Sequence, residues 1–433
     1  MKAAFYTLGC KVNQYETEYM TELLKNAGFE IVSPREKADY YIVNSCTVTA
    51  TADQKTRQNI RKFKRLHPDS TVILTGCMPQ AFPEEAQELT QADIILSNKS
   101  NDSILELINE FSIAHNRIVK IDKHLQNDDF SKCSISHFSE RIRAFVKIED
   151  GCDRYCSYCI IPMSRGFVRS KEPEDLKEEI RVLAENGIKE IVLVGINLSS
   201  YGKGKNFNIT DAVRICCENE NILRVRLGSL EPDHITDEII KGLSRFDKFC
   251  PQFHISLQSG CDKTLKSMNR HYTANEYETL CKKLRNTFEN ATITTDLMTG
   301  FNGETEEDFN ESLSFVKKIG FEKVHTFPYS ERKGTAASKR GDDVPKSVKD
   351  IRARTVIEEA EKIRKGFMDS QSGKIFSVLA ESKSDENIYQ GYTKNYIPVT
   401  FKSDRDIIGE ETDILIKSFD EKNDVCLGEI SNS

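Results

Sequence analysis

The 433-residue sequence is 38% hydrophobic and 30% charged, contains no tryptophan and carries a formal net charge of −7. This length is enough for roughly three domains with sizeable cores, and the acidic balance argues against a strongly basic nucleic-acid binder, so any RNA contact must come from local patches. Thirteen scattered cysteines argue against a secreted disulfide scaffold, and together with the lack of any apolar stretch of membrane-spanning length they indicate a cytoplasmic protein.

Residues 1–125 alternate between short β-type runs and helical patterns, which predicts a parallel α/β domain. The expected strands are Ala3–Leu8, Tyr40–Asn44, Val72–Thr75 and Asp93–Leu96, with helical segments such as Glu16–Ala27 and Ala52–Leu66 between them. A cysteine follows each of the first three strands: Cys10, Cys46 and Cys77. The carboxyl ends of parallel strands lie at one edge of a sheet, so we expect the three thiols to meet in space.

Three converging thiolates predict an iron–sulfur cluster with three protein ligands and one open iron. Gly9 and Gly76 precede two of these cysteines, and glycine lets the backbone approach a ligand closely. The alternative is that each cysteine is a half-buried packing residue, and for any one of them alone this would be the better interpretation.

The helix expected between the second and third of these cysteines carries a run of positive charge. Its basic residues are Lys55, Arg57, Arg61, Lys62, Lys64 and Arg65. A solvated helix face is the ordinary explanation, and contact with RNA phosphates is the alternative. Residues 126–140 then lack any periodicity and are predicted to be a linker.

A second set of cysteines, Cys152, Cys156 and Cys159, has CxxxCxxC spacing in a loop that follows the short apolar strand Phe145–Ile148. A structural zinc site needs four ligands and is usually built from paired arms, so a lone triad does not complete it. Three cysteines on an iron–sulfur cube leave one iron open, where the amino and carboxylate groups of S-adenosylmethionine can chelate. Three unrelated buried thiols are the alternative, which the polar and charged surroundings disfavour.

Six strand–helix units in residues 141–365 predict a partial (β/α)6 barrel. The expected strands are Arg143–Ile148, Glu190–Ile196, Leu223–Leu227, Gln252–Leu257, Thr292–Met298 and Lys323–Tyr329. In barrels of this kind the chemistry takes place at the carboxyl ends of the strands. Residues 141–365 are therefore the expected catalytic domain.

Polar residues gather at those strand ends and are candidates for a nucleoside and amino-acid site. They are Asn197, Ser199, Ser229, Glu231, Gln258, Ser259, Asp296 and the turn Gly300–Glu304. Each could be an ordinary turn residue. We expect Asn197 and Glu231 to contact S-adenosylmethionine, and Arg165 to hold either the cofactor carboxylate or an RNA phosphate, with a solvated role as the alternative.

Residues 366–433 change to short strands, which predicts a small all-β barrel of the OB-like type that many RNA-binding modules use. Within it, the segment GYTKNYIPV offers Tyr392 and Tyr396 as stacking platforms for bases, beside Lys394. A plain packing domain is the alternative, because the segment is otherwise acidic.

Three segments, FYTLGCKVNQYETE, GCDRYCSYCIIPMSRGFVRS and GYTKNYIPV, together resemble the methylthiotransferases of the radical S-adenosylmethionine superfamily over essentially the whole chain. EIVLVGIN, RLGSLEP, MNRHYTANEY and TTDLMTGF are similar to the bacterial branch that modifies threonylcarbamoyladenosine in tRNA. The resemblance implies a methylthiotransferase domain, a radical S-adenosylmethionine core and a tRNA-binding TRAM domain.

The resemblance also implies two 4Fe–4S clusters, one on Cys152, Cys156 and Cys159 that cleaves S-adenosylmethionine, and an auxiliary one on Cys10, Cys46 and Cys77 that supplies sulfur. It implies conversion of N6-threonylcarbamoyladenosine, on the 3′ side of the anticodon of ANN-decoding tRNAs, to its 2-methylthio derivative. An electron donor such as flavodoxin or ferredoxin is an implied partner.

Two alternatives remain at this stage. The same chemistry could act on N6-isopentenyladenosine or on an aspartate of a ribosomal protein. A protein of a different class, a non-catalytic iron–sulfur RNA-binding protein, is the other.

Overall fold

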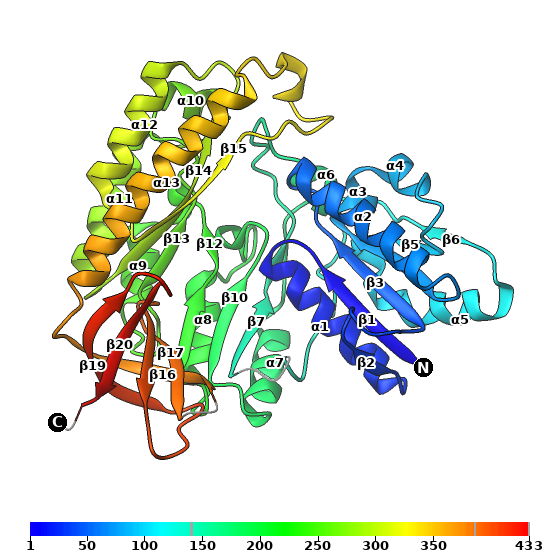
Figure 1. Cartoon of the computed structure of the whole chain (residues 1–433), viewed down its shortest axis with the longest axis horizontal. Helices are drawn as coiled ribbons and strands as arrows, with labels where there is room; N and C mark the ends of the chain where they lie inside the picture. The colour runs from blue at the N-terminus through cyan, green and yellow to red at the C-terminus, as the bar shows by residue number, and fades with distance from the viewer. Residues whose placement is uncertain (139–141, 385–386, 432–433) are drawn as a thin grey trace.

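Three structural units follow one another along the chain (Figure 1) in the computed structural model, which describes residues 1–138, 142–384 and 387–431. Residues 139–140 of the expected linker, residue 141 at the expected start of the catalytic domain, and residues 385–386 and 432–433 of the expected terminal domain lie outside the described residues. No helix in these described ranges is both long enough and apolar enough to span a bilayer.

The N-terminal unit is a six-stranded parallel sheet with strand order β2-β1-β3-β4-β5-β6. Its strands are β1 (Lys2–Thr7), β2 (Glu30–Val32), β3 (Tyr40–Ser45), β4 (Thr71–Gly76), β5 (Ile94–Leu96) and β6 (Ile118–Lys120). Helices α1 (Lys11–Asn26) and α5 (Ile104–Ala114) pack on one face. Helices α2 (Ala50–Leu66), α3 (Cys77–Ala81) and α4 (Pro83–Gln87) pack on the other, which confirms the expected parallel α/β domain.

The central unit is a partial barrel of parallel strands. In order they are β7 (Arg143–Lys147), β10 (Glu190–Val194), β11 (Arg224–Leu227) with β12 (Ser229–Leu230), β13 (Gln252–Ile255), β14 (Thr292–Thr299) and β15 (Lys323–Pro328). β11 and β12 are one run interrupted at Gly228, whose N–H donates to Leu193 O at 2.8 Å. Counting them as one strand gives the six positions that the sequence predicts.

Helices cover the outside of this barrel (Figure 1). They are α7 (Pro173–Glu185), α8 (Ile209–Glu218), α9 (Asp237–Leu243), α10 (Asp262–Ser267), α11 (Ala274–Thr287), α12 (Glu306–Ile319) and α13 (Lys346–Asp369). The short pieces β8 (Glu149–Asp150), α6 (Ile161–Arg165) and β9 (Arg169–Ser170) follow β7. Capping boxes begin α8, α11 and α12, and each satisfies backbone donors that the first helical turn leaves free.

The C-terminal unit is a closed barrel with strand order β16-β17-β18-β20-β19. Its strands are β16 (Ile375–Lys383), β17 (Ile388–Thr393), β18 (Pro398–Lys402), β19 (Glu411–Asp420) and β20 (Val425–Ile430). This confirms the expected small all-β barrel. The segment GYTKNYIPV lies across two antiparallel strands, β17 and β18, which are joined by a turn in which Tyr396 has a φ of 70°.

The segment predicted as a linker is packed and hydrogen-bonded between the first two units. Cys133 is buried, and its carbonyl accepts hydrogen bonds from Tyr15 Oη at 2.8 Å and Lys171 Nζ at 3.1 Å. Ile135 and Phe138 join the core of the barrel, as does Tyr15 of α1. Residues 126–138, the described part of the predicted linker, therefore have an irregular backbone that packs between the two units.

Candidate functional site

The structure brings Cys10, Cys46 and Cys77 to one edge of the N-terminal sheet. Cys10 precedes α1, and the other two follow the last residues of β3 and β4 directly. A side chain on Gly9, which has a φ of 110°, would come within 2.9 Å of Cys46 Cβ, so glycine is required where these two loops meet. The three thiols also act on one another, since Cys46 and Cys10 contribute to raising the pKa of Cys77.

A buried arginine reaches this triad from the central unit. Arg165, in α6, places its Nε 3.3 Å from Cys77 Sγ and forms an ion pair with Glu16 of α1. Burial raises the pKa of the Cys77 thiol to about 12, and the positive charge of Arg165 opposes that rise. The expected place of Arg165, at the cofactor carboxylate or an RNA phosphate, differs from this one, because the guanidinium is fully buried against the N-terminal domain.

The second triad lies in the loop after β7. A Cβ on Gly151 would come within 1.9 Å of Phe167 O, so the loop closes against its own continuation only with glycine at this position. Cys152 N–H donates to Gly166 O at 2.9 Å. Arg270 places NH1 3.3 Å from Cys156 Sγ. Each triad therefore has one sulfur within hydrogen-bond distance of a buried guanidinium, whose positive charge can offset part of the negative charge of a bound cluster.

In the described part of the chain, no three His, Cys, Asp or Glu side chains group closely enough to hold a single metal ion. An iron–sulfur cube differs from one ion in this respect, because each thiolate binds a separate iron. The fit of the two triads to such clusters rests on the arginines beside them and on the glycines that shape their loops.

One carboxyl oxygen and one amide oxygen near the second triad are buried without a hydrogen-bond partner among the described residues. Glu149 and Asn197 are buried, and Asn197 N–H donates to Glu149 Oε2 at 2.6 Å. Glu149 Oε1 and Asn197 Oδ1 have no hydrogen-bond partner among the described residues. Burial raises the pKa of Glu149 well above its ordinary value. Two such orphaned acceptors fit a ligand that brings N–H donors, as the amino group of S-adenosylmethionine does.

The sequence identified Asn197 at this position but missed Glu149. The only signal for Glu149 was a charged residue at the end of an apolar strand just before the CxxxCxxC loop.

Glu231 lies near the second triad but is already paired. Its carboxylate forms an ion pair with Arg270, the residue that contacts Cys156, and lies 4.0 Å from Arg154. The structure thus places Glu231 beside the expected cofactor site, where it holds Arg270 in position.

The inside of the partial barrel is polar. Along β15, Val324 packs on the core, so the alternating His325 points to the opposite side, into the barrel, and is exposed. His254 of β13 lies 2.9 Å from Thr294 Oγ1 through Nδ1 and 3.1 Å from Asp296 Oδ2 through Nε2. Asp296 was among the polar residues expected here, and the two histidines were missed.

Lys11 extends from the N-terminal domain toward this polar interior. Its Nζ lies 5.6 Å from the ring centroid of Phe145 on β7. The side chain is open to solvent, but protein surrounds it at longer range. This desolvation and the charges of Arg143 and Arg226 lower the pKa of Lys11 to about 8.

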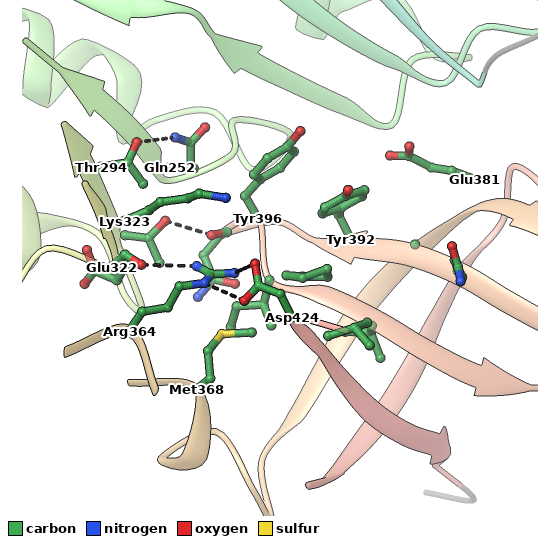
Figure 2. A pocket seen from close by; sticks show the side chains of 18 of the residues that line it. Gln252, Thr294, Glu322, Lys323, Arg364, Met368, Glu381, Tyr392, Tyr396 and Asp424 are labelled. Carbon is green, nitrogen blue, oxygen red and sulfur yellow. Dashed lines mark hydrogen bonds and ion pairs between the residues drawn. The ribbon is translucent and has the colours of Figure 1, made fainter. Parts of the chain in front are cut away.

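A cavity of about 830 Å³ lies between the central and C-terminal units, at the amino ends of β13, β14 and β15 (Figure 2). Tyr392 and Tyr396 stand in it, stacked on each other with ring centroids 4.5 Å apart. Arg143 lies over both rings, and Arg226 lies 4.5 Å from the centroid of Tyr396. The two rings that were expected as stacking platforms for bases are thus stacked on each other and contact arginines of the central barrel, while Tyr396 stays partly exposed.

The basic helix α2 remains a candidate for phosphate contact. Arg57 and Lys64 are paired with Glu85 and Asp93. The other four basic residues, Lys55, Arg61, Lys62 and Arg65, are exposed.

Two family profiles match the chain. Residues 2–97 match Uncharacterized protein family UPF0004, and residues 146–316 match the Radical SAM superfamily. The chain is 36% identical over 413 residues to the threonylcarbamoyladenosine tRNA methylthiotransferase MtaB of Bacillus subtilis, covering 94% of this chain and 92% of the relative. It is 37% identical over 417 residues to the protein of the same name from Thermotoga maritima, covering 96% and 94%.

A relative that is named for a different modified adenosine is about as similar. The chain is 37% identical over 421 residues to the tRNA-2-methylthio-N(6)-dimethylallyladenosine synthase of Clostridium novyi, covering 95% of this chain and 92% of the relative. Among solved structures, the radical S-adenosylmethionine methyltransferase TsrM from Kitasatospora setae superposes with a TM-score of 0.55 at 15% identity, covering 75% of this chain and 72% of TsrM. At that identity the likeness concerns the fold alone.

Proposed function

The chain belongs to the methylthiotransferase family of radical S-adenosylmethionine enzymes, and we propose that it converts N6-threonylcarbamoyladenosine of the tRNA anticodon loop to 2-methylthio-N6-threonylcarbamoyladenosine. Its cofactors are S-adenosylmethionine and two 4Fe–4S clusters. The observation that carries the proposal is the presence of two separate cysteine triads, each beside a buried arginine, in one chain.

In this proposal Cys152, Cys156 and Cys159 hold the cluster that binds S-adenosylmethionine, and Cys10, Cys46 and Cys77 hold the auxiliary cluster. When bound, the first cluster supplies the electron that splits S-adenosylmethionine and yields a radical able to remove hydrogen from an aromatic carbon. Glu149 and Asn197 accept hydrogen bonds from the amino group of the cofactor and so orient it. Arg270, held by Glu231, donates a hydrogen bond to Cys156 Sγ and so helps to position this ligand.

The substrate base must lie between the two triads, inside the open side of the barrel. A base in a single-stranded loop can be splayed out into such a pocket without breaking a duplex. The exposed lysines and arginines of α2 are the proposed contacts for the RNA backbone. Because its substrate would be tRNA, the enzyme is proposed to work in the cytoplasm with a one-electron donor of the flavodoxin or ferredoxin type.

The similarity to dimethylallyladenosine-modifying relatives favours a second candidate, in which the same chemistry acts on a hydrocarbon-substituted adenosine. Mass spectrometry of nucleosides from a strain that lacks the gene separates the two. Loss of 2-methylthio-N6-threonylcarbamoyladenosine, restored by the wild-type chain, supports the first. If that nucleoside is unchanged while the dimethylallyl derivative is lost, the first candidate is wrong.

A further inference from the structure

Lys11 is the first residue of α1 and follows Cys10 directly. Its side chain bridges two units, because its Nζ lies over the ring of Phe145 in the central barrel. The ammonium forms no hydrogen bond or ion pair within the described residues. It is therefore an uncompensated cation next to a proposed ligand of the auxiliary cluster, at the polar interior of the barrel.

The position of this charge is electrostatically unfavourable. The amino end of a helix carries partial positive charge, so a cation there is disfavoured, and the first turn of α1 has no acidic residue to offset it. Arg143 and Arg226 add positive charge nearby. Glu190, the acidic neighbour, is already engaged, since it lies 3.1 Å from Arg226 and 3.6 Å from Arg143.

Packing does not account for the charge. The aliphatic stem of Lys11 can cover Phe145, and an ammonium over an aromatic face gains about 0.5–1 kcal/mol at an exposed site. A methionine at this position would cover the same ring without the electrostatic cost. A positive charge kept at an unfavourable place, open to solvent and without a partner, is suited to a negatively charged ligand.

We propose that Lys11 binds the carboxylate of the threonylcarbamoyl group and thereby selects an acidic substituent on the adenosine over a hydrocarbon one. This inference rests on the proposed function, which places the adenine between the two triads. The side chain next to Cys10 is then within reach of a substituent on that base. His254 and His325, which line the same interior, are suited to the hydroxyl and urea groups of the substituent.

The test is a double-mutant cycle on the reconstituted holoenzyme with two anticodon stem-loop RNAs. One carries threonylcarbamoyladenosine, and the other carries the same group with its carboxylate replaced by a neutral carboxamide. A charge-assisted hydrogen bond is lost in the variant Lys11→Met, so kcat/KM for the acidic RNA is expected to fall by about 10- to 100-fold. For the wild type, kcat/KM should be lower with the carboxamide RNA than with the acidic RNA by a similar factor. For Lys11→Met, kcat/KM should be nearly the same with the two RNAs.

Binding and matched variants complete the test. The dissociation constant of the acidic RNA should rise in Lys11→Met by a comparable factor, and Lys11→Arg should recover most of it. Lys25→Met, which removes an exposed lysine from the last turn of the same helix, should leave both constants unchanged. Iron content is measured for every variant, because Lys11 adjoins Cys10.

The outcomes separate this inference from the proposed function. If the wild type fails to methylthiolate the acidic RNA, the proposed function is wrong. If the wild type acts on the acidic RNA but treats the carboxamide RNA equally well, the inference is wrong whatever the variants do. It is also wrong if Lys11→Met retains full discrimination between the two RNAs.

Discussion

Arg165 belongs to the segment that follows the CxxxCxxC loop, yet its Nε lies 3.3 Å from the sulfur of Cys77, a member of the other triad. The same guanidinium is paired with Glu16 of α1. Glu16 in turn lies 3.0 Å from Lys147 of β7. One buried group of charges therefore connects the surroundings of both cysteine triads.

Replacing Arg165 with leucine should weaken both the fold and the auxiliary cluster. Removing one member of a buried ion pair typically lowers the free energy of unfolding by about 3–5 kcal/mol. Loss of a positive charge beside a cluster ligand should also make the reduction potential of that cluster more negative. Thermal unfolding and a potentiometric titration followed by electron paramagnetic resonance measure the two effects.

The control for this variant is Arg181→Leu, which removes an arginine that forms only exposed ion pairs on α7. It should change neither quantity appreciably. An unaltered auxiliary potential in Arg165→Leu would show that the contact with Cys77 has no electrostatic influence on the cluster.

The two triads should be separable by substitution. Cys156→Ala should abolish formation of 5′-deoxyadenosine, because the cofactor-binding cluster loses a ligand. Cys46→Ala should retain cofactor cleavage and lose sulfur insertion. Anaerobic assays with dithionite, combined with iron and sulfide counting, measure both, and Cys217→Ala, a half-buried thiol of α8 outside the triads, should behave as the wild type does. Identical behaviour of Cys156→Ala and Cys46→Ala would contradict the division of roles.

His124 should make the protein sensitive to mild acid. Burial, together with the charge of Arg169, lowers its pKa to about 4, below the ordinary value of about 6.5. Between these values the unfolded chain binds a proton that the folded chain does not. The contribution of neutral His124 to the free energy of unfolding is therefore fully present above about pH 6.5 and is lost as the pH falls toward 4. At pH 5 the loss is about 2 kcal/mol.

The variant His124→Gln removes this proton while it keeps a polar group near Asn98 Oδ1, which lies 2.9 Å from the histidine ring. Urea denaturation of the wild type and the variant at about pH 7.5 and pH 5 should show a smaller difference between the two pH values in the variant. His137→Gln, at an exposed position, serves as the control. Equal acid sensitivity in the wild type and His124→Gln would count against this assignment.

Arg224 should hold the C-terminal barrel to the central one. It is fully buried, and it donates to Glu411 Oε1 at 2.6 Å, Tyr392 O at 2.5 Å and Ser377 O at 2.9 Å. Arg224→Met leaves these acceptors without their donor, at a cost of about 3–5 kcal/mol. Limited proteolysis should then cleave faster between α13 and β16.

A matched variant on the same barrel is Arg405→Met, because the Arg405 side chain is 70% exposed and paired only with Glu410. Its proteolysis rate should equal that of the wild type. If Arg224→Met is cleaved at the same rate as the wild type, Arg224 does not hold the C-terminal barrel to the central one.

Tyr396→Ala tests whether the stacked tyrosines serve the domain interface or bind bases. Because Tyr396 contacts Arg143 and Arg226 of the central barrel, the substitution should lower the melting temperature and change RNA affinity by less than about twofold. A base-stacking platform would instead lose about 1–3 kcal/mol of RNA binding. Thermal unfolding and fluorescence anisotropy with a stem-loop RNA distinguish the two results.

The overall architecture followed from local patterns in the sequence. Apolar runs such as Glu190–Ile196 predicted the barrel strands, and the rule that parallel strands end at one edge predicted that Cys10, Cys46 and Cys77 meet. The edge strands β2 and β6 were missed because each has only three residues and none of these is fully buried, whereas β5, equally short, is the wholly apolar and buried run Ile94–Leu96.

The partners of individual charges could not be predicted in the same way. Arg165 was expected at the cofactor carboxylate, at an RNA phosphate or in solvent because it lies just beyond the CxxxCxxC loop, but its partner Glu16 is 149 residues away. Glu149 and Lys11 were passed over because burial, orphaned oxygens and missing ion pairs are properties of the folded chain. The contacts of Tyr396 could not be predicted because the guanidinium groups beside it come from another domain.

The buried charges that join α1 to the central barrel also bear on how such enzymes can be recombined. A hybrid that joins this N-terminal domain to a barrel without basic residues at the positions of Arg165 and Lys147 would leave Glu16 without the charges that neutralise it. An unpaired carboxylate would then be enclosed at the seam. We expect such chimaeras to fold only when the residues on both sides of this domain interface come from the same protein. The two domains would then have to be exchanged together.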